Sequence, residues 1–522
     1  MRQAARSRSR GAVKTESISL PAPIGGLNAR DSIANMKSTD AIVLDNFFPT
    51  TTTVDARRGY TQFATFTGVC ESIFVYAGTT TTKVFVAVNT TNDRIMEATA
   101  GGALSTVLVG GSGPTVQAIT NSRFDYANFG TAGGQFLVAV NGSDVPLQYD
   151  GTNWTASGMS GGTPADFFTV AVYAERLWFG VKNSLRVRYQ PVNTIAGATV
   201  ELNLSSLFEL GGYLNSIVTV TDASNVLADY ICFVSSEGEI VAFSGTDPSS
   251  ASTWQRVAQF RVGRPVIKGN RCWTKWGADA LLICSDGILP LRRAISTNNR
   301  DATTTVSDKI RNLINNDVAV HGARYGWALT LHPSGFKLIL NVITAENDSA
   351  RQYVMNVQTG AWCRFTGWDA FCFDVAQDQL YFGGSGFLAR ADQVGALDDA
   401  GASITADAKQ AFNYFGGRGR NVLVNLMRPV LAIDGAANIA LDIDVDYEDT
   451  PPTTFQAIGG STGDPWGGVW DVTWGGATIV ERNWRSVQGF GTAIAPRMRA
   501  QVNDVNLSWS VTDFIFERGA AF

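Results

Sequence analysis

The sequence predicts a mainly β fold: a β-propeller of about five to seven irregular blades, with an N-terminal platform motif and a C-terminal β domain. Two observations predict it. Short β-branched and aromatic runs alternate with turn residues along the chain, whose 522 residues include 53 glycines and 29 phenylalanines. Paired runs of this kind also recur through the middle of the chain, as expected of many strands joined by tight turns.

The composition excludes wholesale disorder and an overall field that attracts polyanions. Hydrophobic residues make up 45% of the chain and charged residues 17%, below the usual charged share of about 25%. The formal net charge is −5, so any contact with nucleic acid has to be local or weak. The six cysteines form no Cys-x-x-Cys pair, and we expect them to be small buried residues in a reducing compartment.

Residues 1–20 form a basic arm without the apolar core of a signal peptide. The chain has no uninterrupted apolar run long enough to span a bilayer, so we expect synthesis in a cytoplasm and no membrane span. Two interpretations of the arm are open: a flexible solvated tail, or a clamp on an acidic protein surface or on DNA phosphates. Its partner-binding candidates are Arg2, Arg6, Arg8 and Arg10.

Residues 21–65 carry a compact motif, PAPIGGLNARDSIANMKSTDAIVLDNFFP, followed by VDARRGY. Gly25 and Gly26 permit the backbone angles of a sharp turn. Asp40 stands at an N-cap position before an apolar run, and Pro49 blocks continuation, so the pattern predicts a helix of about two turns. A helix this short has to dock on another element.

Residues 66–395 contain the recurring strand pairs, at irregular intervals of about 35 to 50 residues. Examples are SIFVYAG with KVFVAVN, and GQFLVAVNG with VPLQYDGTNW. Such a meander cannot bury both of its faces alone, so successive meanders predict blades around an axis, with a pair of β-sandwiches as the alternative. The tryptophans expected at the ends of units are Trp154, Trp178, Trp254 and Trp362.

One interior helix is predicted near 305–319, where Val306, Ile310 and Ile314 recur at helical spacing. It either joins blades or supports one from outside. Residues 396–409 are small and polar and are interpreted as a linker. Residues 410–522 return to long alternating strands and are assigned to a separate β domain, a candidate to pack against the N-terminal motif.

A search for catalytic chemistry returns little. The chain has two histidines, His321 and His332, with no H-E-x-x-H spacing, which disfavours a histidine-based zinc site or triad. No P-loop motif and no dinucleotide-binding motif occurs. The sequence pattern leaves carboxylate pairs of the glycosidase type open as an alternative, and turn and strand-end acids are the default. The acids named for this option are Asp286, Asp369 and Asp374. We predict no catalytic residue, no metal site and no cofactor.

Two further charged segments stand out. Arg418 and Arg420 lie in the loop-like string GGRGRN, where a solvated turn is favoured over a phosphate contact. Asp442, Asp444 and Asp446 alternate with apolar residues, which predicts that they share one face of a strand. An EF-hand fails here because glycine and glutamate are missing at the required positions. The acidic strand is interpreted either as an ordinary solvent face or as an acidic wall that repels a polyanion or receives a basic partner.

The N-terminal motif carries a family resemblance. Gly-Gly-Leu-Asn-x-Arg-Asp at 25–31, Asp-Ala-Ile-x-Leu-Asp-Asn-x-Phe-Pro at 40–49 and Arg-x-Gly-Tyr at 57–60 resemble the opening of nozzle proteins of short-tailed bacteriophages, also called tail tubular protein B or tail stabilisation proteins. RQYVMNVQTGAWCRFTGW and YFGGSGFLARAD resemble the last propeller unit of that family. About a fifth of the chain carries the likeness directly.

The resemblance implies a structural virion protein without catalytic turnover, made in the bacterial host cytoplasm and located in the virion tail. It implies a homo-oligomeric ring of six copies below the portal adaptor. Such a ring conducts and gates double-stranded viral DNA and anchors tail fibres or spikes. A neutral or acidic lumen favours passage, because each basic contact to phosphate adds counterion-release affinity.

Two site hypotheses follow from the resemblance. The adaptor-facing platform is expected to use Gly25, Gly26, Leu27, Asn28, Arg30, Asp31, Asp40, Asp45, Asn46, Phe48, Pro49, Arg57 and Tyr60. The channel is expected to be faced by the acidic strand and the residues after it: Asp442, Asp444, Asp446, Glu448 and Asp449. Two alternatives stay open: a propeller-type glycan-binding or glycan-degrading tailspike, and a scaffolding propeller unrelated to virions.

Overall fold

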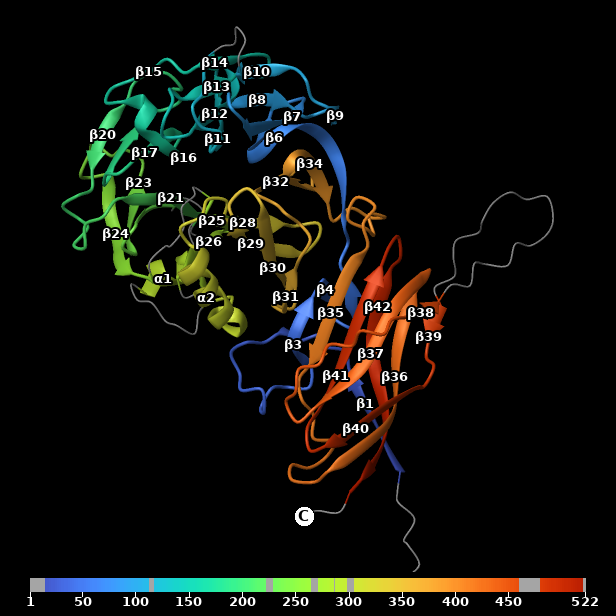
Figure 1. The fold of residues 1–522 in the computed structure, drawn as a ribbon. Coiled ribbons are helices and arrows are strands. Elements are labelled where there is room, and N and C mark those ends of the chain that lie inside the picture. Colours follow the sequence, from blue (N-terminus) through green and yellow to red (C-terminus); the bar gives the residue numbers. More distant parts are fainter. Residues whose placement is uncertain are drawn as a thin grey trace, which may run out of the picture. The chain divides into compact units, whose positions relative to one another are not determined.

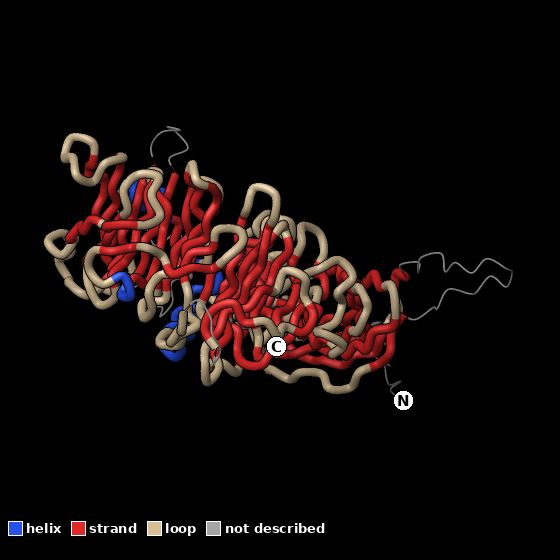
Figure 2. Tube along the Cα trace, turned by 90° about the horizontal axis from the view of Figure 1, so that it is seen from above, coloured by secondary structure: helices blue, strands red, loops and turns tan. Residues whose placement is uncertain are grey.

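The computed structural model describes residues 15–111, 117–221, 229–263, 271–285, 287–297, 305–459 and 479–519. Asp286 and the arginines of the basic arm lie outside these residues. The chain divides into two compact units. Residues 1–57 and 403–522 form the first, here called the terminal unit, and residues 58–402 form the propeller unit. Strands make up most of both units, and helices are few (Figure 2).

The terminal unit is a β-sandwich built from both ends of the chain. One sheet has the order β39 (Ile479–Glu481), β36 (Val422–Ile433), β42 (Leu507–Arg518), β5 (Val54–Ala56) and β4 (Phe47–Pro49), with β1 (Thr15–Pro21) on β42 and β40 (Arg485–Gly491) on β36. The other has the order β3 (Asp40–Asp45), β35 (Ile404–Gln410), β41 (Ile494–Val502), β37 (Ala436–Val445) and β38 (Gln456–Gly459), with β2 (Gly26–Leu27) parallel to β3. Buried side chains from both sheets, such as Phe514 and Ile443, form one core.

The helix predicted after Asp40 is wrong, because this segment is strand β3. Ile42 and Val43 are β-branched, and such residues lose side-chain freedom in a helix and suit a pleated strand. The backbone of β3 is held on one side by β2 and on the other by β35. Asp40 caps no helix, since its carboxylate accepts a hydrogen bond from Asn28 instead.

The propeller unit consists of seven blades of antiparallel strands in the described residues, and Figure 1 shows them following one another around a ring. Blades 1 and 7 are the two halves of one eight-stranded sheet. Blade 1 contains the second half of β6 (Tyr60–Ala77), then β7 (Thr82–Asn89), β8 (Arg94–Glu97) and β10 (Val107–Gly110). Blade 2 contains β11 (Asp125–Thr131), β12 (Gly134–Val140), β13 (Leu147–Tyr149) and β14 (Trp154–Ala156). Blade 3 contains β16 (Phe167–Tyr173), β17 (Arg176–Val181), β18 (Arg186–Tyr189) and β20 (Val200–Asn203).

Blade 4 contains β21 (Leu214–Thr221), β22 (Asp229–Ser235), β23 (Glu239–Gly245) and β24 (Trp254–Arg261). Blade 5 contains β25 (Trp273–Trp276), β26 (Asp279–Cys284) and β27 (Gly287–Pro290). Blade 6 contains β28 (Ala328–His332), β29 (Lys337–Ala345), β30 (Ser349–Asn356) and β31 (Trp362–Phe365). Blade 7 contains β32 (Cys372–Ala376), β33 (Gln379–Gly383), β34 (Ser385–Ala391) and the first half of β6. Short parallel pairs join β9 (Gly102–Ala103) to β6 and β15 (Met159–Ser160) to β19 (Gly197–Ala198).

The ring closes through the long strand β6. Its first half pairs with β34, from Tyr60 opposite Ala391 to Val69 opposite Ser385. Its second half continues into blade 1 and pairs with β7. The inner strand of blade 7 also lies against β6. One strand thus belongs to the last blade and the first, and the propeller predicted from the sequence is confirmed as a closed ring.

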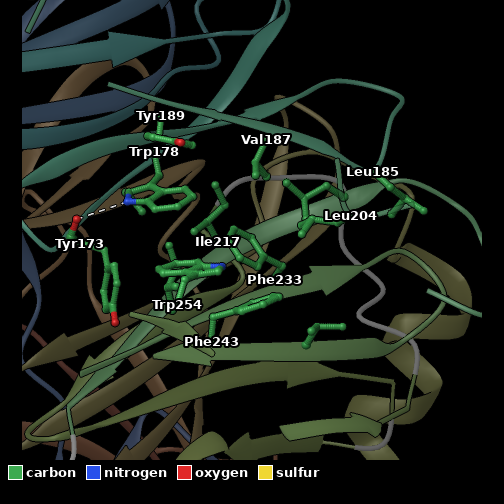
Figure 3. Packing of buried hydrophobic residues seen from close by; sticks show 14 of the residues in the cluster. Tyr173, Trp178, Leu185, Val187, Tyr189, Leu204, Ile217, Phe233, Phe243 and Trp254 are labelled. Atoms are coloured by element: carbon green, nitrogen blue, oxygen red, sulfur yellow. Dashed lines mark hydrogen bonds between the residues drawn. The ribbon is translucent and has the colours of Figure 1, made fainter. Parts of the chain in front are cut away.

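Apolar cores lie between blades 1 and 2, 2 and 3, 3 and 4, and 7 and 1. Between blades 3 and 4, Trp178 stacks on Trp254 with ring centroids 5.4 Å apart, and Phe243 stacks on the other face of Trp254 at 5.2 Å (Figure 3). Three of the four predicted terminal tryptophans lie on fourth strands, but Trp178 lies on the second strand of blade 3. The prediction that Trp178 stands at the end of a unit was therefore wrong.

Two α-helices connect blades 5 and 6 within the described residues. Helix α1 (Leu291–Thr297) follows β27 directly, and α2 (Arg311–His321) follows a 3₁₀ turn, η3 (Asp308–Ile310). Another 3₁₀ turn, η1 (Pro164–Asp166), precedes blade 3. Helix α2 overlaps the helix predicted near 305–319. Asp317 fixes it to blade 6 through an ion pair with Arg351 and a 2.8 Å hydrogen bond from the Tyr353 hydroxyl.

Candidate functional site

Arg271 joins blades that are not neighbours in the propeller ring. Arg271 precedes blade 5, and its guanidinium donates to the carbonyls of Ile73 in blade 1, at 2.8 Å, and Phe373 in blade 7, at 2.9 Å. It also lies 3.7 Å from the Asp374 carboxylate. Blades 5 and 1 are not neighbours in the ring, so this side chain spans the axial space between them.

Two acids and a tyrosine complete this layer. The Tyr126 hydroxyl donates to Asp374 at 2.7 Å, and Arg271 lies over the Tyr126 ring. Burial raises the pKa of Asp374, against the opposing effects of Arg271 and the Tyr126 hydrogen bond. Burial also raises the pKa of Asp125, which accepts hydrogen bonds from Thr169 at 2.7 Å and from the Val170 amide at 3.0 Å. Asp125 thereby ties blade 2 to blade 3.

A second layer surrounds Glu71, which is 2% exposed at the start of the inner strand of blade 1. Its carboxylate accepts hydrogen bonds from Ser122 at 2.6 Å and from Arg123 at 3.0 Å. Arg123 also pairs with Glu346 in blade 6 at 2.5 Å and stacks over the Tyr325 ring. The two layers together are called the axial cluster: Glu71, Arg123, Arg271, Tyr126, Tyr325, Glu346, Asp125 and Asp374.

The axial cluster is held together by contacts within the chain. Its guanidinium groups are bound to carboxylates and carbonyls of the same chain, so they are already satisfied. Within the described ranges, no group of three or more His, Cys, Asp or Glu side chains is placed to hold a metal ion. The cluster is best explained as an ionic brace that fixes the inner strands.

Residues named for other chemistry are dispersed. Asp369 accepts a hydrogen bond from the Ala350 amide at 3.3 Å, while Asp374 belongs to the axial cluster. His321 ends α2, and its Nδ1 lies 2.8 Å from Arg324. His332 ends β28, and its Nδ1 lies 3.3 Å from the Asp392 carboxylate. The structure therefore does not bring the two histidines into one site.

The N-terminal motif makes a closed hydrogen-bond network inside the terminal unit. Asn28 is 1% exposed, and its amide nitrogen donates to Asp31 at 2.9 Å and to Asp40 at 2.8 Å. Its amide oxygen accepts from the backbone of Arg30 and Asp31. Gly25 donates its backbone N–H to Thr39 at 2.7 Å. The motif therefore shapes the turn that joins β2 to β3.

The second part of the motif fixes the chain after β3. Asn46 has a left-handed backbone, with φ of 55°, and accepts a hydrogen bond from the buried Arg57 side chain at 2.8 Å. Its amide nitrogen donates to the Thr405 carbonyl at 2.8 Å. Of the other motif residues, Gly26, Leu27 and Pro49 are buried, Asp45 and Phe48 are half-buried, Arg30 is exposed, and Tyr60 lies on β6 of the propeller unit.

The acidic strand does not present its three aspartates on one solvent face. Asp444 is 2% exposed, and its carboxylate lies 2.8 Å from Lys409. Asp442 is exposed, and strand β37 ends at Val445, so Asp446 lies in a turn with φ of 47°. There Asp446 accepts hydrogen bonds from Thr492 and the Ala493 amide. The prediction that Asp446 shares a strand face with Asp442 and Asp444 was wrong, because the left-handed turn at Asp446 ends the alternation of side chains along the strand.

The loop after β37 completes a charged network. Glu448 is exposed, and its carbonyl accepts a 2.6 Å hydrogen bond from Lys409. Asp449 lies 2.5 Å from Arg497, which also pairs with Asp407 at 2.9 Å. Lys409 and Arg497 were missed because they lie on β35 and β41, far away in sequence. Arg418, named for phosphate, donates to Ala34 and Asn35 of the same unit.

Comparison with known proteins identifies no family. No family model matches the chain, and no curated protein matches it. Similar solved structures include the Myceliophteria thermophila Cps50 (Swd1) β-propeller domain, at 10% identity and a TM-score of 0.40, covering 64% of this chain and 100% of that one. Saccharomyces cerevisiae Sqt1 is similar at 10% identity and a TM-score of 0.37, covering 68% and 96%.

A third similar structure is BBS1N, solved in complex with ARL6DN, at 9% identity and a TM-score of 0.38, covering 65% of this chain and 99% of that one. The β-propeller fold stated above rests on the strand pairing and ring closure of this chain. In the described segments, no helix is long and apolar enough to cross a membrane.

Proposed function

We propose that the chain is a structural protein of a short bacteriophage tail: a nozzle subunit that forms a ring below the portal adaptor, conducts and gates DNA, and carries tail fibres or spikes. The observation that carries the proposal is the use of the N-terminal motif. Its residues, which resemble those of nozzle proteins, form the network of Asn28, Asp31 and Asp40 and the pair of Asn46 and Arg57. That network builds a sandwich from the two ends of the chain.

The axial cluster supports a building-block role for the propeller unit. Arg271 and Arg123 each join blades across the ring through ion pairs and hydrogen bonds. An axis occupied by the chain's own side chains has no room for double-stranded DNA. In this proposal DNA therefore passes through a lumen enclosed by several copies of the chain, as a closed ring of symmetric subunits provides.

The charged network refines the proposed lumen. Asp444 is neutralised by Lys409, so it does not contribute an exposed negative charge. Asp442 and Glu448 are exposed in the terminal unit and remain the candidates for an acidic wall. The double variant Asp442→Lys with Glu448→Lys is expected to slow genome ejection from assembled particles, because added lysines bind phosphate.

The deciding experiment is electron microscopy of virions that encode this chain, combined with a tagged copy located by antibody. We expect the label on the tail below the portal and a ring in end-on views. Purified chain mixed with the portal adaptor is expected to form the same ring, even where the isolated chain is monomeric. A chain absent from virions, or one that releases sugars from host polysaccharide, would contradict the proposal and favour a glycan-degrading protein.

A further inference from the structure

Two cysteines meet at the closure of the propeller ring. Cys70 lies on β6, where that strand passes from blade 7 into blade 1, and Cys372 begins the inner strand of blade 7. They are 302 residues apart in sequence, yet their Sγ atoms are 3.7 Å apart. Both side chains are buried in the core shared by blades 1 and 7. Two free thiols at this distance are in van der Waals contact.

The surroundings leave room for these two sulfur atoms. A Cβ atom at Gly383 would lie 2.5 Å from the Cys70 Sγ and 2.7 Å from the Cys372 Sγ. Glycine is therefore required there for the thiols to face each other. Cys372 donates to the carbonyl of Cys70 at 3.4 Å, and Cys70 donates to the carbonyl of Ser72 at 3.5 Å. These hydrogen bonds hold both thiols at the junction between the blades.

We propose that Cys70 and Cys372 are an oxidisable pair that forms a disulfide and locks the propeller ring covalently. The oxidant is hydrogen peroxide, which is small enough to enter a core during local opening. One thiol is oxidised to a sulfenic acid with release of water. The second thiol attacks that sulfur, forms the S–S bond and releases another water. Two thiols and one peroxide thus yield one disulfide and two waters.

Burial makes this oxidation slow in the folded protein. It raises the pKa of the Cys70 thiol well above its usual value, and the adjacent Cys372 raises it further. Because the thiolate is the reactive form, few molecules react at neutral pH, and the rate rises with pH. The pair thus stays reduced in a cytoplasm and oxidises during long exposure outside it. The resulting bond joins the two ends of the ring, where β6 is otherwise held by hydrogen bonds to β34 and by the apolar core shared by blades 1 and 7.

The test treats the purified full-length chain with hydrogen peroxide, alkylates the remaining thiols after unfolding, and maps the peptides by mass spectrometry. We expect a linked peptide pair containing Cys70 and Cys372, lighter than the reduced pair by two hydrogen atoms. We also expect a higher unfolding temperature for the propeller unit, reversed by a dithiol reductant. A cross-link closing so long a loop restricts the unfolded chain strongly.

The matched variants are Cys372→Ala, which is expected to lose both the cross-link and the temperature shift, and Cys232→Ala. Cys232 is equally buried, in blade 4, and its removal is expected to leave both intact. The wild-type peptide map decides the matter even where a variant folds poorly. Thiols that stay reduced until the chain unfolds, sulfinic or sulfonic acids without the linkage, or random pairing with other cysteines would each overturn the proposal.

Discussion

Position 25 shows how a single residue type can be required by space alone. A Cβ atom on Gly25 would overlap the Asp40 carboxylate and lie 2.8 Å from the Thr39 carbonyl. Asp40 cannot move aside without giving up its hydrogen bond from Asn28. The Gly-Gly pair in the motif is thus explained by packing against a carboxylate that the sequence places fifteen residues later.

Gly25→Ala is therefore expected to destabilise the terminal unit by about 1–3 kcal/mol, the usual cost of overpacking. The measurement is urea unfolding followed by circular dichroism. Gly417→Ala is the matched control, because a Cβ there meets no atom within 4 Å. Equal unfolding free energies of the two variants would show that the turn of the motif accommodates the extra Cβ atom without loss of stability.

Asp444 is a second position at which replacing a single residue is expected to change the stability of the terminal unit. Its carboxylate and the Lys409 ammonium are both almost fully buried, at 1% and 3% side-chain exposure. Removing the Asp444 charge leaves the buried Lys409 ammonium with the mostly exposed Asp449 carboxylate, 3.2 Å away, as its remaining counter-ion. Asp444→Asn is thus expected to cost about 3–5 kcal/mol of unfolding free energy.

Asp442→Asn, on the same strand but exposed, is expected to change stability by no more than about 0.5 kcal/mol. Urea unfolding of both variants makes the comparison. Similar losses of unfolding free energy at the two positions would contradict the burial of Asp444. The expected difference supports excluding Asp444 from any solvent-facing acidic wall.

At the scale of elements, the sequence predicted what depends on local pattern. Short continuous apolar runs, such as those of β7 and β12, indicated strands correctly because each buries side chains against neighbouring blades. The segment after Asp40 was assigned to the wrong element, since its partners β2 and β35 are brought together only by the fold. The same limit applies to Lys409 and Arg497, because no local pattern records the register of β35 against β41 or of β41 against β37.

Blades 6 and 7 are joined by a buried charged group whose effect depends on pH. Asp392 follows β34, and its carboxylate lies 2.7 Å from Lys337 on β29 and 3.3 Å from His332 on β28. Burial alone would raise the pKa of Asp392, but the neighbouring His332 ring and the Lys337 ammonium outweigh burial and lower the pKa of Asp392 below its usual value. The folded chain therefore favours the carboxylate more than the unfolded chain does.

A lowered pKa in the folded state gives stability that is present above the unfolded pKa and lost as pH falls through the folded one. Asp392→Asn removes this contribution. Its deficit in unfolding free energy relative to the wild type is thus expected to be full at neutral pH and to shrink below about pH 4. Urea titrations across that range measure it, and a deficit that stays constant in acid would rule out the ionised carboxylate as its source.

At the scale of the whole molecule, the blade count followed from closure and not from the repeats. Blade 5 has three described strands, and the fourth strand of blade 7 is the first half of β6, which precedes blade 1 in the sequence. A period counted along the chain therefore misses one boundary. The division after Arg57 likewise falls inside the N-terminal motif, because Tyr60 already belongs to the propeller unit.

Closure by β6 predicts which fragment of the chain folds alone. A fragment spanning residues 58–402 keeps the closing strand and the axial cluster, so it is expected to be monomeric and to unfold in one cooperative transition. A fragment spanning residues 70–402 lacks the half of β6 that pairs with β34, which leaves β34 as an open sheet edge. We expect the shorter fragment to aggregate or to be cleaved rapidly by protease at blade 7. Size-exclusion chromatography and limited proteolysis compare the two, and equal behaviour would mean that the ring is held by the axial cluster and the inter-blade cores without its closing strand.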